Sequence, residues 1–310
     1  MATIYHTYAD TNLFREYLAG SGHVADWTED ATVIRILLES VSQRINQFVG
    51  NRSFGVSTAT HSFDIGTGAL RNDSIERTGN EVARPDYWAS LSSGAGRIPL
   101  DDWLLSPTTV TAYDGSARGS SETLTEGIAN DFLLEPYNRS PKNLLKLSEE
   151  TSKSFSGGQQ TLTILGSWGW QDEKSTAIST FDAIGSTTTT SLSVASGAST
   201  YAGYTVLVDT EQMYVESVSS NTLTVVRGVN GTTSATHSGG ASYYRYLYPS
   251  DVVDTCLEIA RNRWRSREVG TTQLIGSGDN QMTRPQESER TLLKRLNYYV
   301  AEMDQAGVFF

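Results

Sequence analysis

The chain begins with a helical pattern of apolar and polar positions. Asp10 is a good N-cap and Gly20 follows the last turn, which predicts a short helix over residues 10–20. Residues 28–50 repeat apolar side chains every three or four positions with charged and amide side chains between them, as an amphipathic helix does. Its expected core-facing residues are Ile34, Leu37, Leu38, Val41, Ile45 and Phe48.

Between residues 54 and 170 the period of the pattern changes to two. Runs such as STATHSFDI and QTLTILGSWGW alternate apolar and polar positions and are separated by Gly, Asn, Asp and Pro, which predicts strands joined by turns. Residues 66–97 are rich in Gly, Ser and Asn and keep no period, so we expect a long surface loop. This part of the chain is expected to form a β-layer.

Residues 171–248 separate the apolar run that ends at Trp170 from a helical pattern that begins at Pro249. They hold five short β-patterned runs, among them YTVLVD, EQMYVESV and NTLTVVRG, and VSSNTLTV predicts a hairpin. Five runs indicate a small β-module, because a lone hairpin is marginal in water. A disordered linker is the alternative for IGSTTTTSLSVASGAST, which offers few bulky residues to bury.

Two helices are predicted after Pro249. The first begins at Ser250 and ends at Gly270, and Thr283 with Gln286 matches a capping box at the start of the second. The printed chain ends in the apolar sequence QAGVFF. The apolar positions of the two helices are Val253, Cys256, Leu257, Ala260 and Trp264, and Leu292, Leu293, Leu296, Tyr299, Val300 and Met303.

Together these patterns predict an α+β fold, with a helix-bundle core and a β-layer interrupted by a small all-β inserted domain. The predicted host consists of residues 1–170, with helices followed by the β-layer, and residues 249–310, with the C-terminal helices. The predicted guest is residues 171–248. Host and guest are then expected to fold as separate bodies.

Composition and charge limit the classes of function. The chain has 310 residues, 38% of them hydrophobic, which is enough for a sizeable core, and a formal charge of −11. Such acidity disfavours a protein that grips nucleic acid, because that binding neutralises phosphates with a basic face. We see neither an apolar run long enough for a membrane span nor a secretion signal at the start, so we expect a cytoplasm-like compartment and no membrane.

Sequence motifs of catalysis and metal binding are scarce. The four histidines lie in unrelated segments without Cys, His or Glu at ligand spacing, and Cys256 sits at core spacing in a helix. SSGAGR at 92–97 lacks the lysine of a phosphate loop, and the adjacent Asp101 and Asp102 would point to opposite faces of a strand. We therefore expect no enzyme, no metal and no cofactor.

Four stretches in a fixed order resemble the head-to-tail connector, or adaptor, proteins of tailed bacteriophages. LLESVSQRINQFVGNRSF resembles the first long helix of that family with its small-basic-aromatic corner, and LSPTTVTAYDG with NDFLLEPYNRSP resembles its strand pairs. LTILGSWGW resembles its strand that ends in Gly, an aromatic residue and Gly, and YPSDVVDTCLEIARNRWRSR the helix that follows. These stretches cover roughly half of the chain, and the insertion at 171–248 departs from the family.

The predicted guest also resembles a known element. VLVDTEQMYVESVSSNTLTVVRGVNGTTSATH is similar to a small β-motif that recurs in phage structural proteins. Asn-Gly suits the left-handed dihedrals of a tight turn, so a structural role is preferred over a binding role for the turn residues. The residues expected to fix the fold are Arg227, Gly228, Asn230 and Gly231, together with His237.

The resemblance implies a virion structural protein, assembled in the host cytoplasm, that forms a ring at the portal vertex between capsid and tail. The ring is expected to hold twelve copies, to contact the portal protein, a tail tube or nozzle protein and tail fibres, and to let genomic DNA pass without specific binding. An acidic bore would repel phosphate, which suits that passage. Residues from about 286 onward are expected to dock on a neighbour or the portal, and a terminal helix that packs on its own subunit with a frayed end is the alternative. The residues expected at these contacts are Arg263, Arg267, Leu292, Leu296, Tyr299, Val308, Phe309 and Phe310.

A β-rich phage adhesin or fibre-attachment protein that binds surface glycans is the alternative. Its sugars would stack on aromatic residues, although packing in a strand core is the simpler explanation for them. A hydrolase is a third class, for which the sequence offers no catalytic constellation. The aromatic residues in question are Tyr201, Tyr204, Tyr243, Tyr244 and Tyr246.

Overall fold

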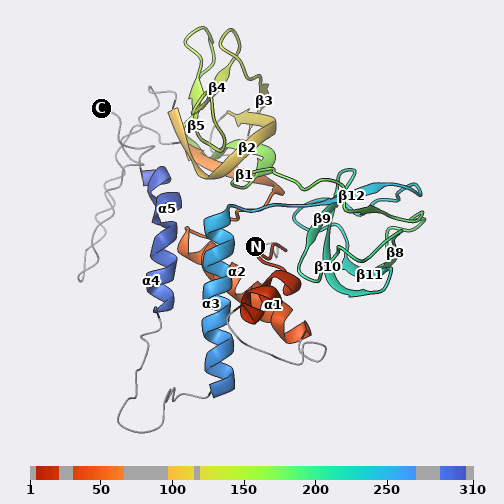
Figure 1. Ribbon diagram of the computed structural model, residues 1–310. Helices are drawn as coiled ribbons and strands as arrows, with labels where there is room; N and C mark the ends of the chain where they lie inside the picture. The colour runs from red at the N-terminus through yellow and green to blue at the C-terminus, as the bar shows by residue number, and fades with distance from the viewer. Residues whose placement is uncertain (1–4, 21–30, 66–96, 115–118, 270–286, 305–310) are drawn as a thin grey trace, which may run out of the picture. The chain divides into compact units, whose positions relative to one another are not determined.

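The computed structural model describes residues 5–20, 31–65, 97–114, 119–269 and 287–304 (Figure 1). Contacts between residues divide the chain into two compact units. The first comprises Met1–Ser57 and Asp172–Ala301, and the second Thr58–Gln171 and Glu302–Phe310. Helices and one sheet belong to the first unit, and a second sheet belongs to the other.

Antiparallel sheet dominates the fold, so the predicted helix-bundle core is wrong. Each unit contains a six-stranded antiparallel sheet, with the order β1-β6-β2-β5-β4 (β3 beside β2) in one and β7-β12-β9-β10-β11-β8 in the other. The expectation gave too much weight to the apolar stripes near the two ends of the chain. Such stripes mark helices that do pack on one another, but two six-stranded sheets make up more of the described structure than these helices do.

The helices of the first unit follow the predicted patterns at most positions. The side chain of Asp10 accepts hydrogen bonds from the amides of Asn12 and Leu13 and thereby caps α1. In α2 the predicted core residues Ile34, Leu38, Val41 and Ile45 are fully buried, whereas the other two, Leu37 and Phe48, are half-buried. The helices are α1 (Thr11–Ala19), α2 (Ala31–Phe48), α3 (Ser250–Val269), α4 (Glu289–Leu293), a 3-10 turn η2 (Lys294–Leu296) and α5 (Asn297–Asp304).

Helix α3 packs against both α1 and α2. Its Trp264 ring meets the ring of Phe14 edge-on at 6.2 Å between centroids, and Cys256 is fully buried, as predicted. The predicted capping box at Thr283 and Gln286 lies outside the described residues. Helix α4 begins at Glu289, and Ser288 is its N-cap.

The sheet of the first unit curls into a small barrel. Strands β10 and β11 pair antiparallel, which confirms the predicted hairpin. A bridge between Phe181 and Val194 joins the two ends of the strand order. The Ser/Thr-rich tract contributes β8 and the buried Leu192 to this barrel, so it is not a disordered linker. The strands are β7 (Ser179–Thr180), β8 (Ser191–Ser193), β9 (Thr205–Val208), β10 (Glu211–Ser219), β11 (Thr222–Val226) and β12 (Ser242–Arg245).

The sheet of the second unit encloses its own apolar core, and its strands confirm the β-layer predicted from the alternating runs. Leu100, Leu104, Leu145, Leu162 and Ile164 are fully or almost fully buried in that core. Of the predicted loop at 66–97, residues 66–96 lie outside the described residues. The strands are β1 (Ser57–Ile65), β2 (Arg97–Tyr113), β3 (Ser121–Leu124), β4 (Phe132–Glu135), β5 (Lys142–Leu147) and β6 (Gly158–Trp168).

The glycines around Trp168 are required by close approaches of the backbone. A Cβ at Gly166 would lie 2.6 Å from the carbonyl oxygen of Ser106. Gly169 has a φ of 148°, and its amide donates to the carbonyl of Trp103 at 2.8 Å. These contacts explain the two glycines of the sequence GSWGW, in which β6 ends at Trp168.

The two contact-based units divide the chain differently from the predicted host and guest. All strands of the barrel lie within residues 171–248, and the first unit combines this barrel with the helices. The second unit holds the β-layer by itself. The insertion of residues 171–248 into a host that folds without them stays a prediction.

Candidate functional site

Glu211, the first residue of β10, carries a fully buried carboxylate that receives several hydrogen bonds. Nε and Nη2 of Arg227 donate to its two oxygens at 2.7 Å each, in the bidentate geometry that suits a guanidinium. The amides of Gly228 and Ala235 donate to the same two oxygens at 3.0 and 2.9 Å. The charge of this carboxylate is therefore paired and hydrogen-bonded, as a buried charge must be.

His237 lies between this carboxylate and a second one. Its Nε2 is 2.8 Å from Oε2 of Glu211, and its Nδ1 is 2.7 Å from Oδ2 of the mostly exposed Asp209. Burial by itself would raise the pKa of the Glu211 carboxyl, but hydrogen bonds from Arg227, Ala235 and His237 hold that pKa below its ordinary value. The Glu211 carboxylate thus stays ionised inside the barrel.

This network ties together distant parts of the barrel. Nη1 of Arg227 also donates to the carbonyls of Ser186 and Thr189, at 3.3 and 3.2 Å. The donors around Glu211 use both of its oxygens, so the carboxylate has little capacity left to act on a substrate. The arrangement is suited to fixing the loop after β11 in one conformation.

The turn after Arg227 places three residues in the left-handed region of backbone conformation. Gly228, Asn230 and Gly231 have φ values of 60°, 55° and 82°. The side chain of Asn230 holds the backbone of Tyr5, with Oδ1 accepting from the Tyr5 amide at 2.7 Å and Nδ2 donating to the Tyr5 carbonyl at 3.3 Å. Nδ2 also donates to Oε1 of Gln212 at 2.8 Å. The turn therefore binds the start of the described chain to the barrel.

His6 follows Tyr5 and is buried under Gly55. Its Nε2 is 2.9 Å from the carbonyl oxygen of Val56 and must donate there, so Nδ1 accepts from the hydroxyl of Tyr248 at 3.0 Å. A Cβ at Gly55 would lie 2.4 Å from the His6 ring, so this position needs glycine. Burial lowers the pKa of His6 to about 4, although the hydrogen bond to Val56 opposes the change.

The next residues continue as a bridge between barrel and helices. Oγ1 of Thr7 lies 3.0 Å from the hydroxyl of Tyr214 in β10, and that hydroxyl donates to Oε1 of Glu39 in α2 at 2.6 Å. The amide of Tyr8 donates to Oγ of Ser42 in α2 at 3.0 Å. Residues 6–10 are all buried. Sequence analysis missed this segment, whose signal was the run of aromatic and polar residues YHTYAD immediately before the first helix.

Three of the predicted docking residues are covered by their own chain. Leu292, Leu296 and Tyr299 are 0%, 0% and 5% exposed. The hydroxyl of Tyr299 donates to the carboxylate of Asp251 in α3 at 2.8 Å, and its ring meets that of Phe54 edge-on at 4.8 Å. In the described structure this part of the C-terminal segment packs on α3 of its own chain, and docking on a neighbour or the portal stays a prediction.

The other predicted docking residues have different surroundings. Nη2 of Arg263 donates to both oxygens of Glu289, at 3.0 and 2.9 Å, and its Nη1 donates to Oγ of Ser40 at 3.1 Å. Arg267 is exposed, and its guanidinium lies over the ring of Trp264 at 5.1 Å. Val308, Phe309 and Phe310 lie outside the described residues.

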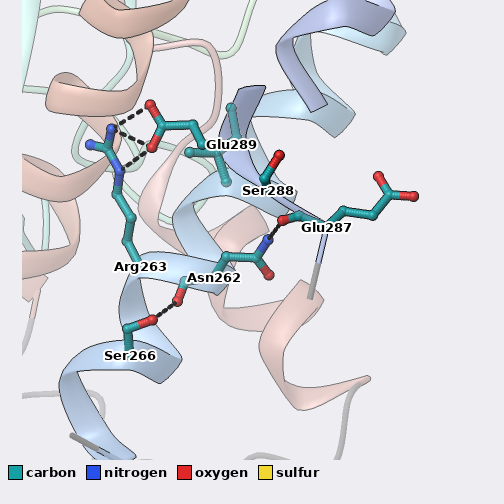
Figure 2. Close-up of a pocket in the computed structure, with 7 residues that line it drawn as sticks. Asn262, Arg263, Ser266, Glu287, Ser288 and Glu289 are labelled. Atoms are coloured by element: carbon teal, nitrogen blue, oxygen red, sulfur yellow. Dashed lines mark hydrogen bonds and ion pairs between the residues drawn. The ribbon is translucent and has the colours of Figure 1, made fainter. Parts of the chain in front are cut away.

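A depression of about 400 Å³ lies beside the ion pair of Arg263 and Glu289 (Figure 2). Nδ2 of Asn262 donates to the carbonyl of Glu287 at 3.3 Å, and Oγ of Ser266 donates to the carbonyl of Asn262 at 2.9 Å. The Asn262 and Arg263 contacts connect α3 to the start of α4, so the depression lies along the boundary between these two segments. Its lining residues are Ile259, Asn262, Arg263, Ser266, Glu287, Ser288 and Glu289.

The aromatic residues considered for glycan stacking belong mainly to the barrel interior. Tyr204, Tyr243 and Tyr246 are buried, and Tyr201 packs edge-on against Tyr204 at 5.8 Å. Tyr244 is exposed at 36%. A glycan platform would therefore have to be built largely from Tyr244 and half-buried neighbours.

Other candidate chemistry is limited in the part of the chain that the structure describes. There we find no group of three or more His, Cys, Asp or Glu side chains placed to hold a metal ion. Among the same residues, none of the helices is both long and apolar enough to cross a bilayer. Burial raises the pKa of the Cys256 thiol to about 12, so this thiol is protonated at neutral pH.

Comparison with known proteins adds no family. No protein-family model, no curated protein and no solved structure matches the chain. The geometry defines a class of architecture: a predominantly antiparallel β protein whose buried N-terminal segment joins a small barrel to a helical layer.

Proposed function

We propose that the chain is a virion structural protein, a head-to-tail adaptor of a tailed bacteriophage. Its copies would form a ring, expected to be dodecameric, that joins the portal to the tail and lets DNA pass. The ring would sit at the portal vertex, and its partners would be the portal protein, a tail tube or nozzle protein and tail fibres. Three features of this chain support the proposal: the packing of α2 on α3, the corner after α2, and the net negative charge.

The pairing of α2 with α3 is the observation that carries the proposal. Both helices resemble helices of connector proteins, and about 200 residues separate them in the sequence. Oγ of Ser42 in α2 lies 3.8 Å from Sγ of Cys256 in α3, and Arg263 of α3 donates to Ser40 of α2 (Figure 1). Two stretches that were identified independently by their patterns therefore belong to one packed layer.

The corner after α2 gives further support. Gly50 and Asn51 have φ values of 85° and 62°, so the chain reverses where the small-basic-aromatic sequence begins. Phe54, the aromatic residue of that sequence, is fully buried, and its ring meets the ring of Tyr8 edge-on at 5.5 Å. The corner is thus a packed element that anchors the end of the helix.

The charge of the chain suits the passage of DNA. At −11, the summed charge repels phosphate over distances of about a Debye length, roughly 8 Å at physiological salt. Repulsion lets a nucleic acid slide through a ring, whereas a basic bore would hold it. DNA is therefore proposed as cargo that passes without specific binding.

The proposal is tested by the size of the purified protein, alone and mixed with the portal protein of the same genome. A ring former gives one large assembly, or is driven to one by the portal, because ring closure needs many copies joined by heterologous contacts. A monomer or trimer that ignores the portal and binds surface glycans would contradict the proposal and favour the adhesin.

A further inference from the structure

Asn230 and Gly231 form the one Asn-Gly pair of the printed sequence. Such a pair is prone to deamidation, because the backbone nitrogen that follows an asparagine can attack the amide carbon of its side chain. Glycine favours the attack, since it has no Cβ to hinder the close approach and leaves the backbone free to turn. The pair is therefore a candidate modification site, and its surroundings decide whether it reacts.

The folded chain holds the side-chain amide of Asn230 in one orientation. Its Oδ1 accepts from the Tyr5 amide at 2.7 Å, and its Nδ2 donates to the Tyr5 carbonyl at 3.3 Å and to Oε1 of Gln212 at 2.8 Å. Asn230 is only 5% exposed. Attack requires the side-chain amide to turn its flat face toward the Gly231 nitrogen, and hydrolysis of the product requires water. Hydrogen bonds that fix the amide plane and burial that excludes water oppose both steps.

The N-terminal segment, residues 5–10, supplies two of these three hydrogen bonds through its first residue. Tyr5 is itself held by the barrel, because Oγ1 of Thr205 donates to its carbonyl at 2.5 Å and its ring lies 5.5 Å from the ring of Tyr214. The rest of the segment is buried. A segment of this kind can open without unfolding of the whole domain. Such an opening would release the side chain of Asn230 from its Tyr5 partners.

We propose that Asn230 is a deamidation site governed by the N-terminal segment. The side chain is protected while Tyr5 is packed on the barrel, and it reacts when the segment leaves. In the reaction the Gly231 nitrogen forms a bond with Cγ of Asn230, the bond from Cγ to Nδ2 breaks, and ammonia leaves with the proton of the Gly231 amide. Water then opens the resulting succinimide at either carbonyl and gives aspartate or isoaspartate.

The products cannot restore the original contacts. Both replace Nδ2 by a carboxylate oxygen, so the Tyr5 carbonyl and Oε1 of Gln212 lose their donor and face a negative charge. Isoaspartate also adds a methylene group to the backbone of a turn whose residues have positive φ values. Deamidation therefore makes a reversible opening of the segment permanent. This chemistry depends on neither the portal nor the ring, so it is independent of the proposed function.

The rate of deamidation at position 230 tests the protection. The full chain is incubated in mildly alkaline buffer, and peptide mapping by mass spectrometry follows aspartate and isoaspartate at that position. The folded chain should react at least about tenfold more slowly than the chain unfolded in urea, because the segment must open first. The exposed Asn138 is an internal reference whose rate should be alike in all folded samples. Equal rates at position 230 in the folded and the unfolded chain would overturn the proposal.

Two variants of Tyr5 test the role of the segment. Tyr5→Pro removes the amide proton that Oδ1 of Asn230 accepts, whereas Tyr5→Phe keeps that amide and the aromatic ring. We expect Tyr5→Pro to deamidate at least about fivefold faster than the unchanged chain, because the side chain loses one of its partners. Tyr5→Phe should react at the unchanged rate.

Leu38→Ala separates opening of the segment from unfolding of the whole unit. Leu38 is fully buried in α2 and takes no part in the hydrogen bonds of Asn230, so its loss leaves a cavity and lowers the free energy of unfolding. Release of the segment alone predicts that Tyr5→Pro accelerates deamidation more than Leu38→Ala does, even where urea unfolding shows that Leu38→Ala is the less stable variant. Acceleration in proportion to the lost free energy of unfolding, or none in Tyr5→Pro, would show that the segment does not govern the site.

Discussion

The side chain of Asn230 pairs with the backbone of Tyr5 as a residue on a neighbouring β-strand would. Its Oδ1 accepts from the Tyr5 amide at 2.7 Å, and its Nδ2 donates to the Tyr5 carbonyl at 3.3 Å. The segment that starts at Tyr5 then reaches α2 through Tyr8 and Ser42. One turn residue of the barrel therefore anchors the segment that joins the barrel to the helices.

Asn230→Asp is expected to destabilise the first unit by about 1–3 kcal/mol, because it removes two donors and turns a carboxylate toward the Tyr5 carbonyl and Gln212. Urea unfolding measures the change. Asn221→Asp is the matched control, because Asn221 uses its oxygen to accept from the amide of Gly197, and a carboxylate can do the same. Equal losses in both variants would show that the donors of Asn230 do not matter.

Arg227→Ala should cost about 3–5 kcal/mol, since it leaves the Glu211 carboxylate buried without its main partner. Lys174→Ala removes a cation from an exposed pair with Asp172 and should cost about 1 kcal/mol or less. Thermal unfolding of both variants beside the unchanged chain gives the comparison. A small loss for Arg227→Ala, similar to that for Lys174→Ala, would contradict a fold-fixing role.

Stability should fall with acidification because of His6. Its pKa is about 4 when folded and about 6.5 when unfolded, so the unfolded chain binds the extra proton between these values. The contribution of neutral His6 is fully present above about pH 7.5 and is lost as the pH falls toward 4, by about 2 kcal/mol at pH 5. His6→Gln keeps a donor for Val56 but cannot titrate.

The free energy of unfolding, measured at pH 7.5 and pH 5, should therefore drop more for the unchanged chain than for His6→Gln. Other groups that titrate contribute to both chains and cancel in the difference. An identical drop in the two chains would mean that His6 is not buried in its neutral form.

Replacing residues 171–248 by a short Gly/Ser link tests the predicted insertion. The interpretation as a guest domain predicts that the remaining chain still unfolds cooperatively. The midpoint should be lower, because the deletion removes Tyr214 and Gln212, which contact Thr7 and Val56. Calorimetry measures both properties, and the loss of any cooperative transition would argue against an insertion.

Local patterns predicted the elements of this fold better than their packing. The alternating run STATHSFDI is β1, and the stripe from Ile34 to Ile45 faces the core of α2. In each case neighbouring positions carry the signal. The helix-bundle core was wrong because the striped helices form only one layer, while the two sheets enclose apolar cores of their own that the stripes do not report.

The candidate site was predicted only in part, for a related reason. Arg227 and its turn stood out by their composition, but Glu211 lies 16 positions earlier, and a single acidic residue in a strand usually faces solvent. Tyr5 and His6 precede the first predicted helix and carry no pattern of their own. Their contacts with Tyr248 and Asn230 join positions more than 200 residues apart, which no local pattern can reveal.

Electron micrographs of the chain assembled with its portal protein test the central claim most directly. Class averages should show a closed ring of this protein, expected to hold twelve copies, stacked coaxially on the portal with an open bore. Averages that show the portal without added density, beside separate monomers or trimers of this chain, would contradict a head-to-tail adaptor.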